Sequence, residues 1–191
     1  MRNLYVAGID SIDIGEDQTS DYTRDPSKFA IVIKRRAIGI KPPTYVAYYK
    51  FRPQDERQAY TVAMQLLVYY NCRCNIEATR LSMLNWAKVK GWKNYFMNRP
   101  LKTYPEDKKR GSSTIGTPAT PTIISHQTDL IRDYIEDYST EMWFEEMLDE
   151  LTKYTDENKG KFDLVAALGM CELADEELSG VIPREIDEED I

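Results

Sequence analysis

Apolar and polar positions divide the first part of the chain into three strand-like segments. YVAGID (5–10) is a short run of β-formers with too little alternation for a surface strand, which indicates a buried central strand that ends in an acid. Residues 11–28 are rich in Asp, Ser, Thr and Gly and predict a long loop. FAIVIKRR (29–36) and TYVAYYKF (44–51) predict two further strands joined by a proline-containing turn, so the three strands favour a meander.

The pattern changes to helical spacing after residue 53. Apolar side chains at positions 59, 63, 66, 67 and 70 predict a helix of about four turns. CRCNIEAT (72–79) is a short apolar strand that runs into an acid, Glu77, and RLSMLNWAKVKG (80–91) predicts a helix that ends at its glycine. WKNYFMN (92–98) predicts a fifth strand.

The remainder of the chain begins with a proline-rich stretch and continues with three amphipathic helices. Four prolines between Arg99 and Thr122 predict a long loop. SHQTDLIRDYIEDY (125–138) and TEMWFEEMLDELTKY (140–154) have apolar residues at helical spacing. The side chains expected on their buried faces are Leu130, Ile131, Tyr134, Ile135, Trp143, Phe144, Met147, Leu148 and Leu151. KGKFDLVAALGMCELADEEL (159–178) predicts a last helix whose apolar face begins one residue after Asp163.

These elements predict one α/β domain over residues 1–180, followed by an acidic tail (181–191) that we expect to be disordered. A hydrophobic content of 42% and a charged content of 30% are typical of a soluble globular protein. No window approaches the roughly eighteen apolar residues of a membrane span, and the N-terminus lacks a signal-peptide pattern. We therefore expect an intracellular protein without a membrane partner. The three cysteines have poor zinc spacing and are predicted to be reduced core residues.

The formal net charge of -7 is unevenly distributed along the chain. Residues 172–191 contain nine acids and one base, whereas residues 80–110 contain nine bases and two acids. The basic stretch is either a solvated face or a surface that follows DNA phosphates. The candidate DNA-contacting residues, including two lysines near the last helix, are Arg80, Lys108, Lys109, Arg110, Lys159 and Lys161.

Acids stand at the ends of the first and fourth predicted strands and at the start of the last helix. If these strands pair in parallel through a right-handed crossover, Asp10 and Glu77 lie at the same edge of the sheet, and a helix across the sheet could bring Asp163 to them. Three carboxylates without basic partners raise one another's pKa, so such a cluster favours binding of a hard cation. Oxygen ligands with open positions suit Mg²⁺ or Mn²⁺, and two such ions about 4 Å apart support phosphodiester hydrolysis.

Other chemistries have little support. The chain has a single histidine, His126, which excludes histidine-rich metal sites and disfavours a Ser-His-Asp or Cys-His-Asn hydrolase. Neither a phosphate-binding loop with its lysine nor a dinucleotide-binding glycine motif occurs, so the chain does not have the pattern of an ATPase.

Four segments together resemble the nuclease domain of bacteriophage large terminase subunits, a member of the ribonuclease H-like superfamily. They are YVAGID, NIEAT, IGTPATPTIISHQTDLIRDYIED and KGKFDLVAALGMCELADEE. The resemblance implies a ribonuclease H-like α/β fold with a mixed central sheet of five or more strands flanked by helices. It implies that Asp10, Glu77 and Asp163 are the metal-binding catalytic triad of an endonuclease that cleaves double-stranded DNA with Mg²⁺ or Mn²⁺, and that two ions take part.

The same resemblance implies a place in viral genome packaging. The implied partners are double-stranded DNA, a terminase ATPase domain, the portal and the small terminase subunit, and the implied location is the host cytoplasm, transiently at the procapsid portal. The Walker motifs of the ATPase half are absent, so we expect either an excised domain or a separately encoded nuclease.

The chain departs from the family pattern at two places. Ser11, Ile12 and Asp13 stand where the family has a small-residue turn, and Asp13 is either a fourth, outer metal ligand or a loop cap. Phe162 stands where an acid or histidine often precedes the last aspartate. Two alternatives stay open: a RuvC-like resolvase or other nuclease of the same superfold, and a non-catalytic ribonuclease H-like interaction module whose carboxylates cap loops.

Overall fold

The apolar segments of the first part of the chain form a four-stranded mixed sheet in the computed structural model, which describes residues 3–12, 27–104, 114–155, 157–158 and 162–183. The strands are β1 (Tyr5–Asp10), β2 (Phe29–Arg35), β3 (Thr44–Phe51) and β4 (Arg73–Ile76), in the order β3-β2-β1-β4. β1 pairs antiparallel with β2 and parallel with β4, and β2 pairs antiparallel with β3. The predicted meander and the parallel pairing of the first and fourth strands are thus confirmed.

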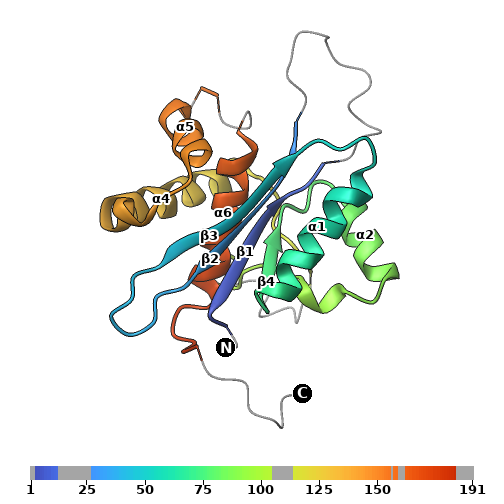
Figure 1. Ribbon diagram of the computed structural model, residues 1–191, viewed down its shortest axis with the longest axis horizontal. Helices are drawn as coiled ribbons and strands as arrows, with labels where there is room; N and C mark the ends of the chain where they lie inside the picture. Colours follow the sequence, from blue (N-terminus) through green and yellow to red (C-terminus); the bar gives the residue numbers. More distant parts are fainter. Residues whose placement is uncertain (1–2, 13–26, 105–113, 156, 159–161, 184–191) are drawn as a thin grey trace.

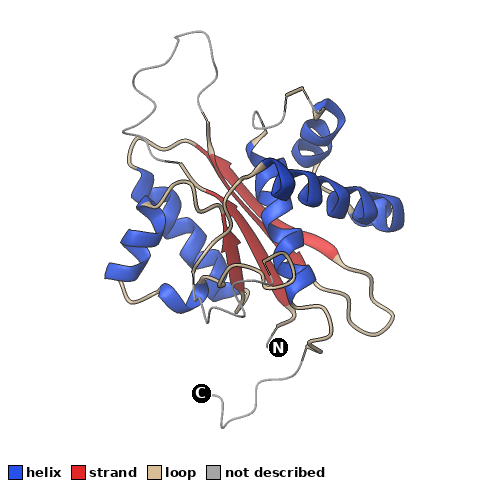
Figure 2. Cartoon of the chain, turned by 180° about the vertical axis from the view of Figure 1, so that it is seen from behind, coloured by secondary structure: helices blue, strands red, loops and turns tan. Residues whose placement is uncertain are grey.

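Helices cover both faces of the sheet, which gives an α/β/α arrangement (Figures 1 and 2). α1 (Glu56–Tyr69) and α2 (Ser82–Val89) lie on one face, and α4 (Pro121–Tyr138), α5 (Glu145–Lys153) and α6 (Asp163–Glu177) lie on the other. Two short 3₁₀ turns, η2 (Lys93–Tyr95) and η3 (Ser139–Glu141), connect them. This α/β fold with a helix-flanked mixed sheet agrees with the fold class predicted from the sequence at that level.

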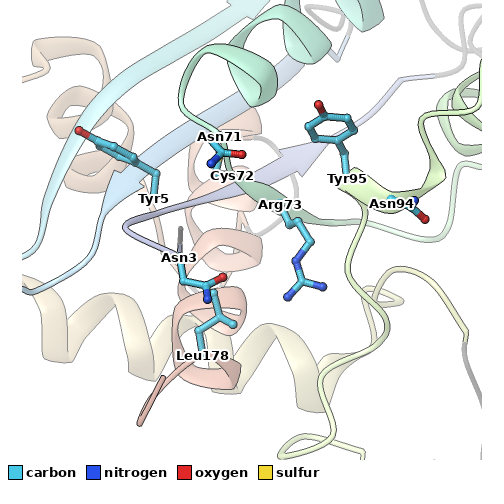
Figure 3. Close-up of a pocket in the computed structure, with 8 residues that line it drawn as sticks. All are labelled: Asn3, Tyr5, Asn71, Cys72, Arg73, Asn94, Tyr95 and Leu178. Carbon is cyan, nitrogen blue, oxygen red and sulfur yellow. The ribbon is translucent and has the colours of Figure 1, made fainter. Parts of the chain in front are cut away.

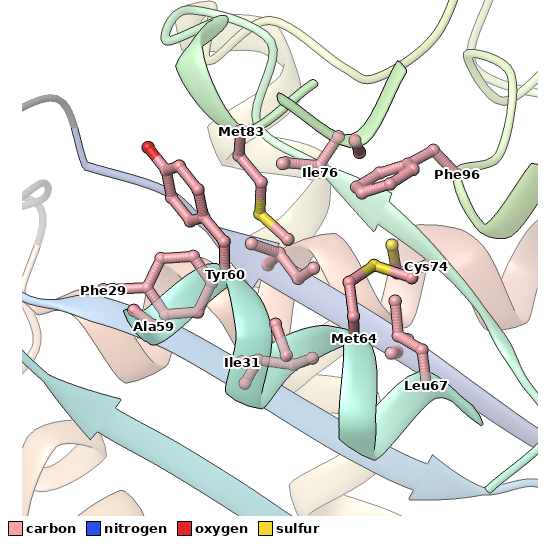
Figure 4. Close-up of a cluster of buried hydrophobic side chains, with 14 of the residues drawn as sticks. Phe29, Ile31, Ala59, Tyr60, Met64, Leu67, Cys74, Ile76, Met83 and Phe96 are labelled. Atoms are coloured by element: carbon pink, nitrogen blue, oxygen red, sulfur yellow. The ribbon is translucent and has the colours of Figure 1, made fainter. Parts of the chain in front are cut away.

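Because helices cover both faces of the sheet, odd- and even-numbered side chains of a strand are both buried. This explains why the strands are continuous apolar runs without polar alternation. Phe29 and Ile31 of β2 pack with α1 and α2, and Figure 4 shows this cluster around Tyr60 and Met64. The intervening Val32 packs in the second core, against α6 and α4. The three cysteines are buried and free, as predicted.

The predicted fifth strand (92–98) is wrong. Residues 93–95 form η2 instead, and the segment after it makes only isolated bridges, from Phe96 to Cys74 and from Asn98 to Ile115. Extended backbone begins only at Phe96, and proline at position 100 cannot donate to a ladder, so the extended stretch is too short to form a strand. Within the described ranges the sheet therefore has four strands, not the five or more that were expected.

Two helix starts also differ from the prediction. α4 begins at Pro121, inside the predicted loop, because the Thr120 hydroxyl accepts a hydrogen bond from the Ile123 N–H and proline suits the first helical position. α5 begins at Glu145 rather than near Thr140. The residue Trp143 therefore precedes the helix and is 73% exposed, and Leu148 is 41% exposed, so their predicted burial is wrong.

None of the helices in the described part of the chain combines the length and the apolar character needed to cross a membrane.

Candidate functional site

Asp10 and Glu77 are neighbours at the carboxyl ends of two parallel strands. The register pairs Gly8 with Asn75 and Ile9 with Ile76, and the Glu77 N–H continues the ladder with a 3.0 Å hydrogen bond to the Ile9 carbonyl. Asn75 contacts Met170 of α6, and residues two apart on a strand share a face, so Asp10 and Glu77 lie on the α6 side of the sheet. The two carboxyl groups are hydrogen-bonded to each other.

Asp163 reaches the same edge from the other layer, as the first residue of α6. α6 lies directly against β1 at Gly8, which has no side chain. A Cβ atom at this position would stand 2.1 Å from the Ala167 carbonyl oxygen. The Asp163 carboxylate accepts a hydrogen bond from the backbone N–H of Lys28, at the entry to β2, and its charge acts on Asp10. The structure thus brings together the three acids singled out in the sequence.

Burial dominates the electrostatics of this edge. It raises the pKa of Asp10 well above its ordinary value, and the charges of Glu77 and Asp163 raise it further, while Arg80 lowers it. Burial raises the pKa of Asp163 to about 6, and Glu150 adds to this effect. Two of the three carboxyl groups therefore hold protons more tightly than isolated carboxyls, because burial and neighbouring negative charges outweigh the nearby cations.

The carboxylates are engaged with one another and with nearby donors. Glu77 accepts a hydrogen bond from the Thr79 hydroxyl in addition to its bond with Asp10, and Asp163 is held by Lys28. Accordingly, no three carboxylate, imidazole or thiol groups in the described ranges have the geometry of a formed metal site. The donor set is oxygen-only, which fits Mg²⁺ or Mn²⁺ once these hydrogen bonds are exchanged for a cation.

Cations also border the site, which corrects the expectation of acids without basic partners. The charge of Arg80 acts on Asp10, and its guanidinium donates a 3.2 Å hydrogen bond to the Ser11 carbonyl. Lys50 of β3 and Lys28 lower the pKa of Asp163 through their charges. Sequence analysis singled out Arg80 as a DNA contact and missed both lysines, because nothing in the local pattern links β3 to the start of α6.

Glu150 of α5 is a further residue that sequence analysis missed. Its Oε2 accepts hydrogen bonds from the N–H groups of Leu164 (3.0 Å) and Val165 (3.2 Å), and its other oxygen pairs with Lys50. The preceding residue Phe162 makes no side-chain cap, so a carboxylate from a neighbouring helix satisfies the first donors of α6. Glu150 therefore fixes the helix start on which Asp163 stands.

The remaining predicted residues are not part of this cluster. His126 pairs with Glu176 at 2.9 Å, toward the other end of α6. Outside the described residues lie Asp13, Lys108, Lys109, Arg110, Lys159 and Lys161. The cavity beside Glu77 measures only about 80 Å³, too little for a nucleotide.

Neither a known family model nor a curated protein matches the sequence. A function for this protein must therefore be inferred from the geometry of the three carboxylates.

Proposed function

We propose that the protein is a metal-dependent endonuclease that hydrolyses phosphodiester bonds in double-stranded DNA. The observation that supports this most directly is the convergence of Asp10, Glu77 and Asp163 from β1, the end of β4 and α6 at one end of the sheet, with the pKa of Asp10 and Asp163 raised. Carboxyl groups whose pKa is raised by burial and by neighbouring negative charge are stabilised as carboxylates by a divalent cation. Arg80 and Lys28 beside these acids could contact a phosphate backbone.

In this proposal Asp10, Glu77 and Asp163 hold Mg²⁺ or Mn²⁺, as two ions in the two-metal form. A divalent cation held by these carboxylates would supply the activation of water and the stabilisation of the leaving oxygen. Asp10, whose pKa is raised, would bind the cation in its ionised form. Arg80, whose charge already acts on Asp10, neutralises substrate phosphate at the same edge. Glu150 keeps Asp163 in place through the backbone of α6.

The more specific assignment rests on the resemblance alone. We propose a ribonuclease H-like fold and the role of packaging nuclease in a viral terminase, with an ATPase domain, portal and small subunit as partners. The four-stranded sheet with a parallel β1–β4 pair and α6 across it supports this assignment at the level of topology.

One observation favours a second candidate, a non-catalytic interaction module. Glu77 and Asp163 already satisfy nearby donors, Thr79 and Lys28, as carboxylates that cap loops do. Such a module needs no cation, whereas the nuclease does. Binding of a divalent ion therefore discriminates the two.

The test is nicking of supercoiled plasmid with Mg²⁺ or Mn²⁺, with EDTA as the blank. Asp10→Asn keeps the shape of the side chain and removes its charge, so we expect a folded variant without detectable cleavage. Asp149→Asn, on the exposed face of α5, is the matched control and should cleave as the wild type does. Glu77→Gln combined with Asp10→Asn should cost little more than either alone, because all three acids serve one centre.

Wild-type cleavage by Asp10→Asn would remove this residue from the site. Absence of both cleavage and an Mn²⁺-dependent rise in melting temperature in the wild type would favour the interaction module.

A further inference from the structure

A second polar cavity lies at the edge of the sheet opposite the carboxylates. It measures about 720 Å³, within the range of roughly 300–1,000 Å³ that small-molecule sites occupy. Four segments border it: the start of β1, the turn between α1 and β4, η2, and the end of α6 (Figure 3). The lining residues are Asn3, Tyr5, Asn71, Cys72, Arg73, Asn94, Tyr95 and Leu178.

Arg73 gives this cavity its charge. It is the only Asp, Glu, Lys or Arg among the lining residues that the structure describes, and burial raises the pKa of the neighbouring Cys72 thiol to about 12, so that thiol stays neutral. The guanidinium makes no hydrogen bond or ion pair with any residue that the structure describes. In Figure 3 it extends into the space between Asn3 and Asn94, whereas the rings of Tyr5 and Tyr95 point away from it.

Three side-chain amides accompany the guanidinium. Asn3, Asn71 and Asn94 come from three separate backbone segments, and within the described ranges none of their amide groups has a hydrogen-bond partner. Asn3 (φ 58°) and Asn71 (φ 45°) are also the only described residues other than glycine with a positive φ. Sparsely populated backbone conformations of this kind cluster at ligand sites.

We propose that this cavity binds a small phosphate monoester of the nucleoside monophosphate type. A guanidinium presents a planar fork of donors that matches a phosphate group, and none of the described residues that line the cavity is a carboxylate that would repel it. Amides both donate and accept, so Asn3, Asn71 and Asn94 can pair with the hydroxyl and ring groups of the rest of the ligand.

This site is independent of the proposed nuclease centre. Tyr5 lies at the cavity and Asp10 at the carboxylate edge, so the length of β1, roughly 17 Å at 3.3 Å per residue, separates them. The binding test therefore does not depend on a divalent cation.

Isothermal titration calorimetry of the full chain in EDTA tests the proposal, with adenosine 5′-monophosphate, adenosine and inorganic phosphate as probes. We expect the monophosphate to bind at least tenfold more tightly than either of its parts. Arg73→Gln should weaken it at least tenfold and leave the melting temperature unchanged, since no hydrogen bond or ion pair joins Arg73 to another described residue. Lys93→Gln removes the same charge from adjacent η2, outside the lining, and should change affinity by less than twofold.

Asp10→Asn should bind the monophosphate as the wild type does, even though the nuclease proposal expects it to be inactive. Several outcomes overturn the inference: no binding of the monophosphate, equal binding of inorganic phosphate, or equal losses in Arg73→Gln and Lys93→Gln. A loss in Asp10→Asn as large as in Arg73→Gln would overturn it as well, because it would place the ligand at the carboxylates. As a second probe of the same space, Asn94→Trp should block the cavity and abolish binding.

Discussion

Gly8 of β1 and Ala167 of α6 are in direct backbone contact, with no room for a side chain between them. Asp10 follows Gly8 by two residues on the same face of the strand, and Asp163 precedes Ala167 by about one helical turn on the same face of α6. The contact between Gly8 and Ala167 therefore sets how closely Asp10 and Asp163 approach each other.

Gly8→Ala should lower the free energy of unfolding by about 1–3 kcal/mol, the usual cost of overpacking. A Cβ atom there would stand 2.1 Å from the Ala167 oxygen and 2.2 Å from the Cys171 nitrogen, so the whole helix must move. Urea denaturation measures the loss. The same displacement should separate Asp163 from Asp10 and weaken Mn²⁺ binding, if the carboxylates hold the ion.

Gly169→Ala on the same helix is the comparison. The three atoms nearest to its Cβ atom would all belong to the side chain of Gln127, at 2.8–3.0 Å, whereas the Cβ atom at Gly8 would stand 2.1 Å from a backbone oxygen. Because Ala also suits a helix interior better than Gly, by up to about 1 kcal/mol, Gly169→Ala should cost clearly less. A Gly8→Ala cost no larger than that of Gly169→Ala would contradict the close-packing argument.

Local sequence patterns were enough to predict much of the fold in the first part of the chain. Apolar runs bounded by polar turns identified β1 to β4, and the parallel crossover then predicted that Asp10 and Glu77 share an edge. The glycine in YVAGID was itself a signal, since glycine inside a strand often marks close approach of another backbone. Its consequence became visible only once α6 was placed across β1.

The wrong or missing predictions concern features that depend on contacts between elements distant in sequence. Apolar composition in WKNYFMN does not reveal that the backbone turns at residues 93–95, and helical spacing in TEMWFEEMLDELTKY does not reveal that the helix starts only at Glu145. Glu150 looks like any acid on an amphipathic helix until the start of α6 is brought beside it. The same holds for Lys50, which reads as a solvated strand residue.

The raised pKa of Asp163 predicts a pH-dependent effect of Asp163→Asn. Burial raises this pKa from 3.8 to about 6 in the folded chain. Between pH 4 and 6 the unfolded chain loses the proton that the folded chain keeps, so rising pH destabilises the wild type relative to a variant that cannot ionise. Without divalent ions, the stability advantage of Asp163→Asn should grow across this window, by on the order of 1 kcal/mol after solvent screening.

Melting temperatures of both proteins from pH 4 to pH 7 check this, with Asp149→Asn on the exposed face of α5 as the control. The difference in melting temperature between Asp149→Asn and the wild type should not change with pH. A difference between Asp163→Asn and wild type that is constant across the window would show that the folded-state pKa of Asp163 is not raised.

Replacement of Glu150 should loosen the start of α6. Glu150→Gln retains one acceptor but loses the charge at the helix N-terminus and the pairing with Lys50. We expect a stability loss of about 1 kcal/mol, as for a lost cap, and faster hydrogen exchange at the Leu164 and Val165 amides than in the rest of α6.

Glu146→Gln is the matched control, because Glu146 also pairs with Lys50 and is 44% exposed, while the first N–H groups of α6 bond to Glu150 instead. Its stability should stay within about 0.5 kcal/mol of wild type. Unchanged exchange at Leu164 and Val165 in Glu150→Gln would refute the capping role.

Lys34 of β2 anchors α6 through a buried ion network. Its ammonium is 2.7 Å from Glu172 and 2.8 Å from Asp175, and it lies 4.8 Å from the ring centre of Tyr134. Burial alone would lower the pKa of Lys34, but Glu172 and Asp175 raise it above its ordinary value, so Lys34 stays charged. Asp175 has a second cation in Arg36, whereas among the described residues Glu172 keeps only the hydroxyl of Tyr45 as a partner when Lys34 is removed.

Lys34→Met should therefore cost about 3–5 kcal/mol, the range for a buried pair that loses one partner. Most of that cost comes from the uncompensated charge on Glu172, so Lys34→Met combined with Glu172→Leu should recover at least half of it, and the two changes should be strongly non-additive. Lys153→Met breaks the 2.7 Å pair with Asp149 on the exposed face of α5 and should cost less than about 1 kcal/mol. Additive effects in the double variant, or equal losses for Lys34→Met and Lys153→Met in urea denaturation, would show that burial gives the Lys34 network no special weight.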